Sequence, residues 1–399
     1  MQTNLAPDVL ATESGRRADE ILRACVHCGF CNATCPTYSM LGDELDGPRG
    51  RIYLVKEMLE AGTPSLAARD HLDRCLTCRA CETTCPSGVA FGELAEIGRE
   101  FIESGLPRGR WETFLRAWIL RVVPNPKALR VWASLGRPFR WLMPSHIAAA
   151  VPAPKRTKRR AARDLPRRVV LLEGCVQRVA TPGVNAALAR LLDLAGVATV
   201  TVDDEGCCGA LPLHLGDMER ARAAMWANVD ALAHALTGAE AIVSTASGCG
   251  VTVKDYGRLL AGDPLYAVRA ARVAEVTRDA GEYLAAIGFE PKAKAGIRRV
   301  AWHPPCTLQH GQRSDSAVES LLEAAGYELV PVRDRHLCCG SAGTYSVLQP
   351  ALARELKSRK LEALTEHAPD VIATANVGCE LFLARDAKIP VRHWLELID

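Results

Sequence analysis

The sequence lacks the features that mark membrane-spanning, secreted or nucleic-acid-binding proteins. Its 399 residues include no run of eighteen or more uncharged apolar residues, which excludes a conventional transmembrane helix. The first thirty residues lack the apolar core of a secretory signal peptide, so we expect a cytoplasmic protein. The formal net charge is only +3, so the overall charge does not indicate a nucleic-acid partner.

Nucleotide-binding and flavin-binding motifs are also absent. No Gly-x-Gly-x-x-Gly follows a predicted strand, there is no phosphate-binding loop, and nothing resembles a flavin site.

The length and the 48% hydrophobic content allow two or three domains with buried cores. Charge is unevenly distributed, because residues 155–168 hold eight basic residues against one acid. This stretch follows the proline-rich VPAP and indicates an exposed linker between two halves, or a surface for an anionic partner or lipid. We therefore divide the chain into residues 1–105, 106–167, 168–295 and 296–399.

Cysteine is abundant, with sixteen residues, and cytosolic thiols are kept reduced, so metal binding explains them better than disulfides. CVHCGFCNATCP begins at Cys25 and CLTCRACETTCP begins at Cys75, with the same spacing. This spacing matches the bacterial ferredoxin run, in which three close cysteines hold one 4Fe-4S cluster and the fourth reaches the other cluster. We predict two 4Fe-4S clusters, one held by Cys25, Cys28, Cys31 and Cys85, the other by Cys75, Cys78, Cys81 and Cys35. Zinc is the alternative, but structural zinc sites do not need eight cysteines in two identical runs.

The segment between the two runs predicts helices. Pro48 is placed near a helix start, apolar residues follow at helical spacing, and Gly62 marks the stop. A second helix is expected to begin at Ser65 and to deliver Cys75. The module resembles the alpha-helical ferredoxin domains of multi-subunit dehydrogenases.

Residues 105–150 contain four of the seven tryptophans, interleaved with arginines and cut by prolines. Such a basic, aromatic and amphipathic segment is typical of a helix pair that lies on a membrane surface or docks on a partner subunit. The alternative is that the tryptophans pack the segment onto the iron-sulfur module.

The second half contains an internal repeat. Its first four cysteines recur at offsets of 131, 131, 131 and 130 residues: Cys175, Cys207, Cys208 and Cys249 become Cys306, Cys338, Cys339 and Cys379. Each copy alternates predicted strands with helices, beginning with the strands at 168–174 and 298–303, so we expect two α/β domains with parallel sheets.

The repeated cysteines follow predicted strands, so those of each copy should converge at the carboxyl edge of its sheet. The residues leave four occupants open: an iron-sulfur cluster, zinc, a redox-active dithiol, or a thiol group without a cofactor. His303, His310 and His336 lie near the second set and either add a ligand or proton relay, or are structural.

Several motifs together resemble one family over essentially the whole chain. ACVHCGFCNATCPTY, DELDGPRGRIYL, HLCCGSAGTY and TASGCG are similar to sequences of the iron-sulfur subunits of bacterial glycolate oxidases. The Cys-Cys-Gly repeats alone are less specific, because they are also similar to those of heterodisulfide reductases, lactate-utilisation proteins and the anaerobic glycerol-3-phosphate dehydrogenase. Thr252 and Phe382 stand where a heterodisulfide reductase would have a closing cysteine, which argues against that chemistry.

The resemblance implies a role in electron transfer. FAD-containing partner subunits would oxidise glycolate to glyoxylate, and this chain would relay single electrons to a quinone or another membrane acceptor at the cytoplasmic face of the inner membrane. The alternatives are the equivalent subunit of a lactate or glycerol-3-phosphate complex, a disulfide-reducing enzyme that uses Cys207, Cys208, Cys338 and Cys339, and a zinc-stabilised scaffold.

Overall fold

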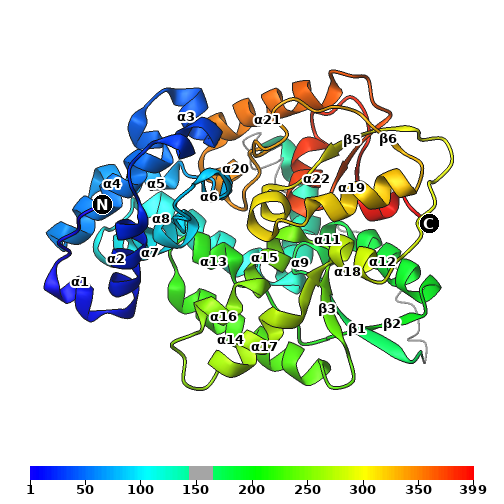
Figure 1. Cartoon of the computed structure of the whole chain (residues 1–399), viewed down its shortest axis with the longest axis horizontal. Helices are drawn as coiled ribbons and strands as arrows, with labels where there is room; N and C mark the ends of the chain where they lie inside the picture. The colour runs from blue at the N-terminus through cyan, green and yellow to red at the C-terminus, as the bar shows by residue number, and fades with distance from the viewer. Residues whose placement is uncertain (143–164) are drawn as a thin grey trace.

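The computed structural model describes residues 1–142 and 165–399. It has a helical N-terminal unit (1–105), a helical arm (106–142), a first α/β unit (165–295) and a second α/β unit (296–399) (Figure 1). Most of the basic stretch 155–168, which we predicted to be a linker, lies outside the described residues. Within the described ranges, no helix has both the length and the apolar character needed to cross a membrane.

The N-terminal unit is built from short helices around the two cysteine runs. As predicted, Pro48 begins a helix that ends before Gly62, whose φ of 67° suits glycine, and the side chain of Ser65 caps the next helix by accepting from Ala68 N. The elements are α1 Pro7–Ala11, α2 Glu13–Ala24, η1 Phe30–Thr34, α3 Pro36–Leu41, η2 Glu44–Asp46, α4 Pro48–Ala61, α5 Leu66–Asp73, α6 Ala80–Thr84 and α7 Phe91–Gly105. The apolar faces of α2, α4, α5 and α7 form the core of this unit.

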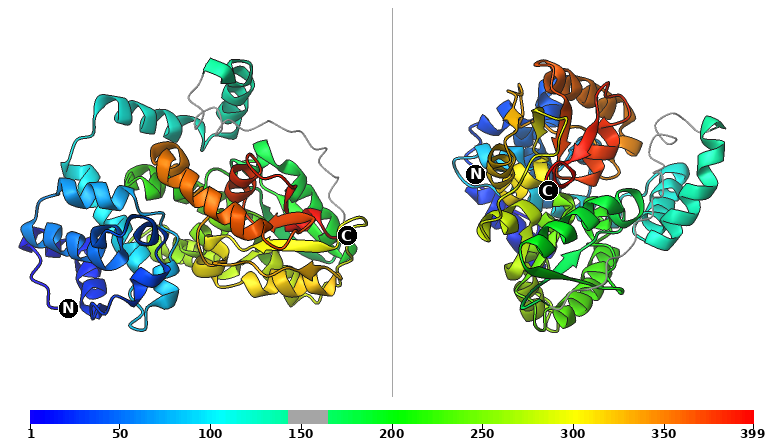
Figure 2. Two further views of the ribbon diagram at one scale, coloured as in Figure 1. Left: turned by 90° about the horizontal axis from the view of Figure 1, so that it is seen from above. Right: turned by 90° about the vertical axis from the view of Figure 1, so that its right-hand side faces the viewer.

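The arm consists of α8 Arg110–Val122, α9 Pro126–Gly136 and η3 Arg137–Leu142. Figure 2 shows it along one side of the molecule. Val122 and Leu129 pack on Val179 of the first α/β unit, so α9 does not pack onto the iron-sulfur module. Trp118 and Trp132 form an edge-to-face pair, whereas Trp111 and Trp141 are 70% and 79% exposed. The aromatic surface of the arm therefore lacks a partner among the described residues.

The first α/β unit has a four-stranded parallel sheet in the order β2-β1-β3-β4. Its strands are β1 Arg167–Leu172, β2 Val197–Thr201, β3 Ala241–Ser244 and β4 Thr277–Asp279. Its helices are α11 Gln177–Ala180, α12 Pro182–Leu194, α13 Ala210–His214, α14 Met218–Ala235, α15 Ser247–Lys254, α16 Tyr256–Leu259, α17 Ala267–Val276 and α18 Ala280–Ala286. The predicted parallel α/β fold is confirmed, although the sequence analysis did not identify β4.

The second α/β unit repeats this topology with the order β6-β5-β7-β8. Its strands are β5 Arg299–His303, β6 Glu328–Leu329, β7 Val371–Thr374 and β8 Val391–His393. The other elements are η4 Thr307–Gln312, α19 Asp315–Ala324, α20 Tyr345–Leu348, α21 Pro350–Thr365, α22 Val377–Leu383 and η5 Trp394–Glu396. β6 has only two residues, and the sequence analysis did not identify β8.

The two α/β units share one hydrophobic core. Val169 and Leu188 of the first unit belong to the same buried cluster as Trp302, Val318 and Trp394 of the second. The carboxyl edges of the two sheets also meet, because α15 lies against η4. Ser247 Oγ and Thr307 Oγ1 lie 2.7 Å apart across this contact. The repeated cysteines of both units therefore lie near one internal interface.

Because the two α/β units share one hydrophobic core, we expect them to unfold together in a single transition. Leu188→Ala in α12 removes a fully buried side chain and should lower the free energy of unfolding by about 3 kcal/mol. The measurement is anaerobic urea unfolding followed by near-ultraviolet circular dichroism. Leu194→Ala, on the same helix but 68% exposed, should change the free energy by less than about 0.5 kcal/mol. Separate transitions for the two units in the Leu188 variant would show that the core is not shared.

Candidate metal centres

The eight ferredoxin-type cysteines line two cavities, and each cavity combines cysteines of both runs. The first cavity is lined by Cys25, Cys28 and Cys31 of the first run and by Cys81 and Cys85 of the second. The second cavity is lined by Cys75, Cys78, Cys81 and Cys35. Cys81 borders both cavities, so the two groups are neighbours. This arrangement is the one that the predicted cross-ligation requires.

The loops that carry the close cysteines share an unusual backbone. His27 and Thr77 have φ values of 59° and 52°, and Gly29 and Arg79 follow at 83° and 62°. The same two positions of each run are therefore left-handed. Such turns direct backbone N–H groups toward a common centre, and Thr77 N donates to Cys75 Sγ at 3.4 Å. The chain thus offers hydrogen bonds to sulfur where negative charge would gather.

The spacing of the donors distinguishes a cluster from a single ion. Two groups of three metal-binding side chains among the described residues have all their ligand atoms within 4.8 Å of one another. One group is Asp43, Asp46 and His71, and the other is His303, Cys339 and Cys379. Neither group includes a ferredoxin-type cysteine. Four thiols around a central space, too far apart for one ion, suit a cubane whose cysteines bind different irons. The residues therefore fit 4Fe-4S clusters better than zinc.

A buried arginine compensates charge at the second group. Arg51 is 1% exposed, donates to Cys35 Sγ at 3.8 Å and pairs with Asp46 at 3.4 Å. Burial alone would lower the pKa of Arg51, but the thiols of Cys75 and Cys35 and the Asp46 carboxylate hold it above its ordinary value. Arg49, two residues earlier on α4, lines the first cavity but is 35% exposed and paired with Glu44.

The two groups differ in exposure. Cys28 of the first group is exposed, and Val26 and Phe30 beside it are 67% and 64% exposed. Cys78 of the second group lies against Cys306 and Cys338 of the second α/β unit, and burial, followed by the nearby Cys306 thiol, raises its pKa. The first group thus faces the surface, while the second is enclosed.

The repeated cysteines converge within each α/β unit. In the first unit, hydrogen bonds link Cys175 to Cys207, Cys207 to Cys208 and Cys208 to Cys249. The bond from Cys175 lowers the pKa of Cys207, while the bond to Cys207 raises that of Cys175. In the second unit the corresponding chain is Cys306, Cys338, Cys339 and Cys379.

The three histidines near the second set have different environments. His310 Nδ1 lies 3.0 Å from Thr83 Oγ1, and its Nε2 lies 2.9 Å from the carbonyl oxygen of His336. Both ring nitrogens of His310 are thus used, which supports its structural interpretation. His303 instead lies with its ring beside Cys339 and Cys379.

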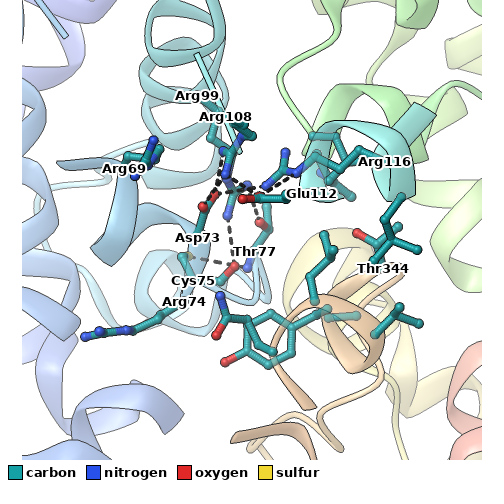
Figure 3. A pocket seen from close by; sticks show the side chains of 18 of the residues that line it. Arg69, Asp73, Arg74, Cys75, Thr77, Arg99, Arg108, Glu112, Arg116 and Thr344 are labelled. Carbon is teal, nitrogen blue, oxygen red and sulfur yellow. Dashed lines mark hydrogen bonds and ion pairs between the residues drawn. The ribbon is translucent and has the colours of Figure 1, made fainter. Parts of the chain in front are cut away.

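A cavity of about 550 Å³ reaches the second group and was not predicted from the sequence. It lies where the N-terminal unit, α8 and both α/β units meet, and Cys75 is part of its wall. Figure 3 shows arginines converging on Asp73, which accepts from Arg108 at 2.7 Å. Burial would raise the pKa of Asp73, but Arg108 and Arg116 hold it below its ordinary value. Because it is assembled from distant segments, no local motif marks this cavity.

Two domain families match the chain. Residues 21–89 match the 4Fe-4S dicluster domain, and residues 169–254 and 300–384 match the cysteine-rich domain. The N-terminal unit is therefore a 4Fe-4S dicluster domain, as the cysteine spacing predicted, and the internal repeat is a pair of cysteine-rich domains.

Two relatives match nearly the whole chain. The glycolate oxidase iron-sulfur subunit of Escherichia coli K12 is 47% identical over 401 residues, covering 100% of this chain and 98% of that protein. The probable glycolate oxidase iron-sulfur subunit of Bacillus subtilis 168 is 30% identical, covering 96% and 93%.

Other similarities are partial or concern the fold alone. A lactate utilization protein of Shouchella clausii is 25% identical over 238 residues, covering 58% of this chain and 98% of that protein. A hypothetical protein from Helicobacter pylori has a solved structure with a TM-score of 0.56 and 10% identity, covering 96% of this chain and 72% of that one.

The buried guanidinium of Arg51 predicts an effect on reduction potential. Arg51→Gln removes a positive charge beside the second group and should lower the potential of one of the two clusters by on the order of 50 mV, at an effective dielectric constant of about 20. The measurement is a redox titration followed by electron paramagnetic resonance, with iron and sulfide content checked. Arg49→Gln should give a much smaller shift, because Arg49 is half-exposed and already paired with Glu44. Equal shifts in both variants would contradict this assignment.

Proposed function

This chain belongs to the family of glycolate oxidase iron-sulfur subunits, and from that membership we propose that it is the electron-transfer subunit of a flavin-dependent enzyme that oxidises glycolate to glyoxylate. The oxidation releases two electrons and two protons, and a flavin on a partner subunit accepts both electrons. This chain has no flavin motif, so its part is to pass the electrons on singly. The observation that carries the proposal is the gathering of eight thiols into two neighbouring groups.

The proposed ligands follow the two groups. Cys25, Cys28, Cys31 and Cys85 hold one cluster, and Cys75, Cys78, Cys81 and Cys35 hold the other. When bound, the clusters supply two adjacent one-electron carriers. The chain's own residues fix the sulfur positions and donate hydrogen bonds to them.

The flavin subunit is proposed to dock over the exposed first group. Cys28 reaches the surface there, and Val26, Phe30 and Tyr53 add exposed apolar side chains nearby. Apolar and aromatic side chains of this kind are typical of the centre of a protein interface. Electrons would therefore enter the chain at the first group.

The acceptor side is proposed to be the cavity beside Cys75. Trp111 of α8 lines that cavity while remaining 70% exposed. The arm, residues 106–142, holds eight basic residues against the single acid Glu112, and of these Arg108 and Arg116 pair with Asp73. A basic surface with exposed aromatic residues suits an anionic membrane surface, from which a quinone would reach the cavity. This arrangement would place the chain at the cytoplasmic face of the inner membrane.

Cys28→Ser tests the relay. We expect the variant, in complex with its flavin subunits, to lose quinone reduction while glycolate still reduces the flavin, because the first group loses a ligand. The measurement is the bleaching of flavin and iron-sulfur absorbance after anaerobic addition of glycolate, with lactate and glycerol 3-phosphate as comparison substrates.

Leu66→Ser, at an exposed position of the same unit that lines neither thiol cavity, is the control and should keep at least half of the turnover. Full turnover in the Cys28 variant would overturn the relay. A wild-type complex that responds to lactate but not to glycolate would overturn the substrate assignment alone.

The membrane assignment is tested on the arm. Replacing Trp132 and Trp141 with serine removes two exposed aromatic side chains, and we expect weaker binding to vesicles containing anionic lipid, by roughly tenfold. Quinone reduction in those vesicles should fall, while reduction of a water-soluble dye should not. Leu265→Ser, exposed by 77% on the first α/β unit, is the control. Unchanged vesicle binding with loss of the flavin subunits would show that the arm is a protein interface.

A further inference from the structure

The two cysteine-rich repeats differ at one position beside their thiols. His303 is the last residue of β5, three residues before Cys306, and pairs in register with Thr374. Leu172 is the last residue of β1, three residues before Cys175, and pairs in register with Ser244. The structural repeat thus replaces a buried leucine by a histidine in the second unit alone.

His303 is buried without a hydrogen-bonding partner. It is 1% exposed, and neither Nδ1 nor Nε2 has a partner in the structure. Burying polar ring nitrogens without partners destabilises the fold, so a leucine would be more stable at this position unless the ring serves a purpose. Burial also lowers the pKa of His303. A neutral imidazole has a nitrogen lone pair available for a metal.

The ring lies beside two thiols at a distance suited to one ion. A ring nitrogen of His303, Cys339 Sγ and Cys379 Sγ all lie within 4.8 Å of one another, and the two sulfurs are 3.3 Å apart. A tetrahedral ion with bonds of about 2.3 Å to sulfur separates two thiolates by about 3.8 Å. The observed pair needs to move only slightly to reach that geometry, whereas the thiolates of a cubane bind different irons and lie farther apart.

We propose that the second α/β unit binds one transition-metal ion, of the class of Zn²⁺ and Fe²⁺, through His303, Cys339 and Cys379. Imidazole and thiolate together are the donor set that these ions prefer. These three side chains supply three donors, which leaves one position of a tetrahedron to a further ligand. In the first unit, Leu172 offers no donor, and its four cysteines form no such compact group within the described chain.

The surroundings balance the charge of this donor set. Lys360 is 3% exposed, donates to the carbonyl oxygen of Asp334 at 2.8 Å and interacts with the thiols of Cys338, Cys339 and Cys379. Its ammonium group favours the thiolate form of these cysteines, which is the form that binds metal. The buried positions of α14, the corresponding helix of the first unit, carry no cation: Ala221, Met225, Asn228, Val229 and Leu232. The second unit thus places a buried cation beside its cysteines, and helix α14 of the first unit does not.

The position of the site gives it a consequence for the neighbouring iron-sulfur group. Cys306 and Cys338 adjoin both the proposed donors and Cys78. A bound ion would hold these thiols in place against the second ferredoxin-type group. The site requires only the metal-binding residues of this chain, so it does not rest on glycolate as the substrate.

Metal and sulfide counting on the full chain, purified anaerobically, tests the proposal. We expect one zinc or iron ion per chain beyond the eight irons of two 4Fe-4S clusters, with no sulfide beyond that of the two clusters. His303→Leu, which introduces the side chain of the first repeat, should lose that ion and keep the sulfide. Cys379→Ser should do the same, and X-ray absorption should show a bond from the wild-type ion to nitrogen.

Leu172→His, at the matching position of the first repeat, should not change the metal content. Unchanged visible absorbance in all variants would show that the two clusters and the fold are intact. The proposal is overturned if the wild-type chain holds no additional metal, or if the His303→Leu variant keeps it. Joint loss of iron and sulfide from that variant would also overturn it, because the site would then hold a further cluster.

Discussion

The free-energy cost of burying negatively charged thiolate sulfur is the constraint on which the rest of this structure depends. A thiol binds metal as a thiolate, yet burial raises the pKa of Cys81 and of Cys78 well above their ordinary values. The fold offsets this cost with a buried arginine at one group and a buried lysine at another. Metal binding supplies the remaining compensation, so the thiol groups and the metals that they hold stabilise each other.

The same constraint explains why duplication did not produce two equal halves. The two α/β units keep one topology, one cysteine spacing and one interface between their sheet edges. They differ in the side chains beside sulfur, where Leu172 corresponds to His303, and in their neighbours, because only Cys306 and Cys338 adjoin a ferredoxin-type cysteine. The absence of closing cysteines at Thr252 and Phe382 applies to both units and removes the ligand on which a disulfide-reducing site would depend.

The sequence was informative where local rules decide the structure. The spacing of Cys25 to Cys85 predicted two mixed groups of thiols, and Pro48, Gly62 and Ser65 predicted helix ends, because caps and short loops are local. It was uninformative for β4 and β8, three-residue strands whose existence depends on neighbouring strands. The 550 Å³ cavity and the pairing of His303 with Cys339 and Cys379 were also not predictable, since each depends on segments that only the tertiary fold brings together.

The two ferredoxin-type groups differ in the surfaces from which a partner can reach them. A partner can approach the first group directly at Cys28, but the second is covered by the second α/β unit through Cys306 and Cys338. Among the cavities that touch the second group, the large one beside Cys75 is the one open enough to admit an organic acceptor. Under the proposed docking, the flavin subunit and the acceptor meet different surfaces, and electrons pass from one to the other through this chain. Because Trp111 belongs both to that cavity and to the exposed arm, whatever covers the arm also controls access to the second group.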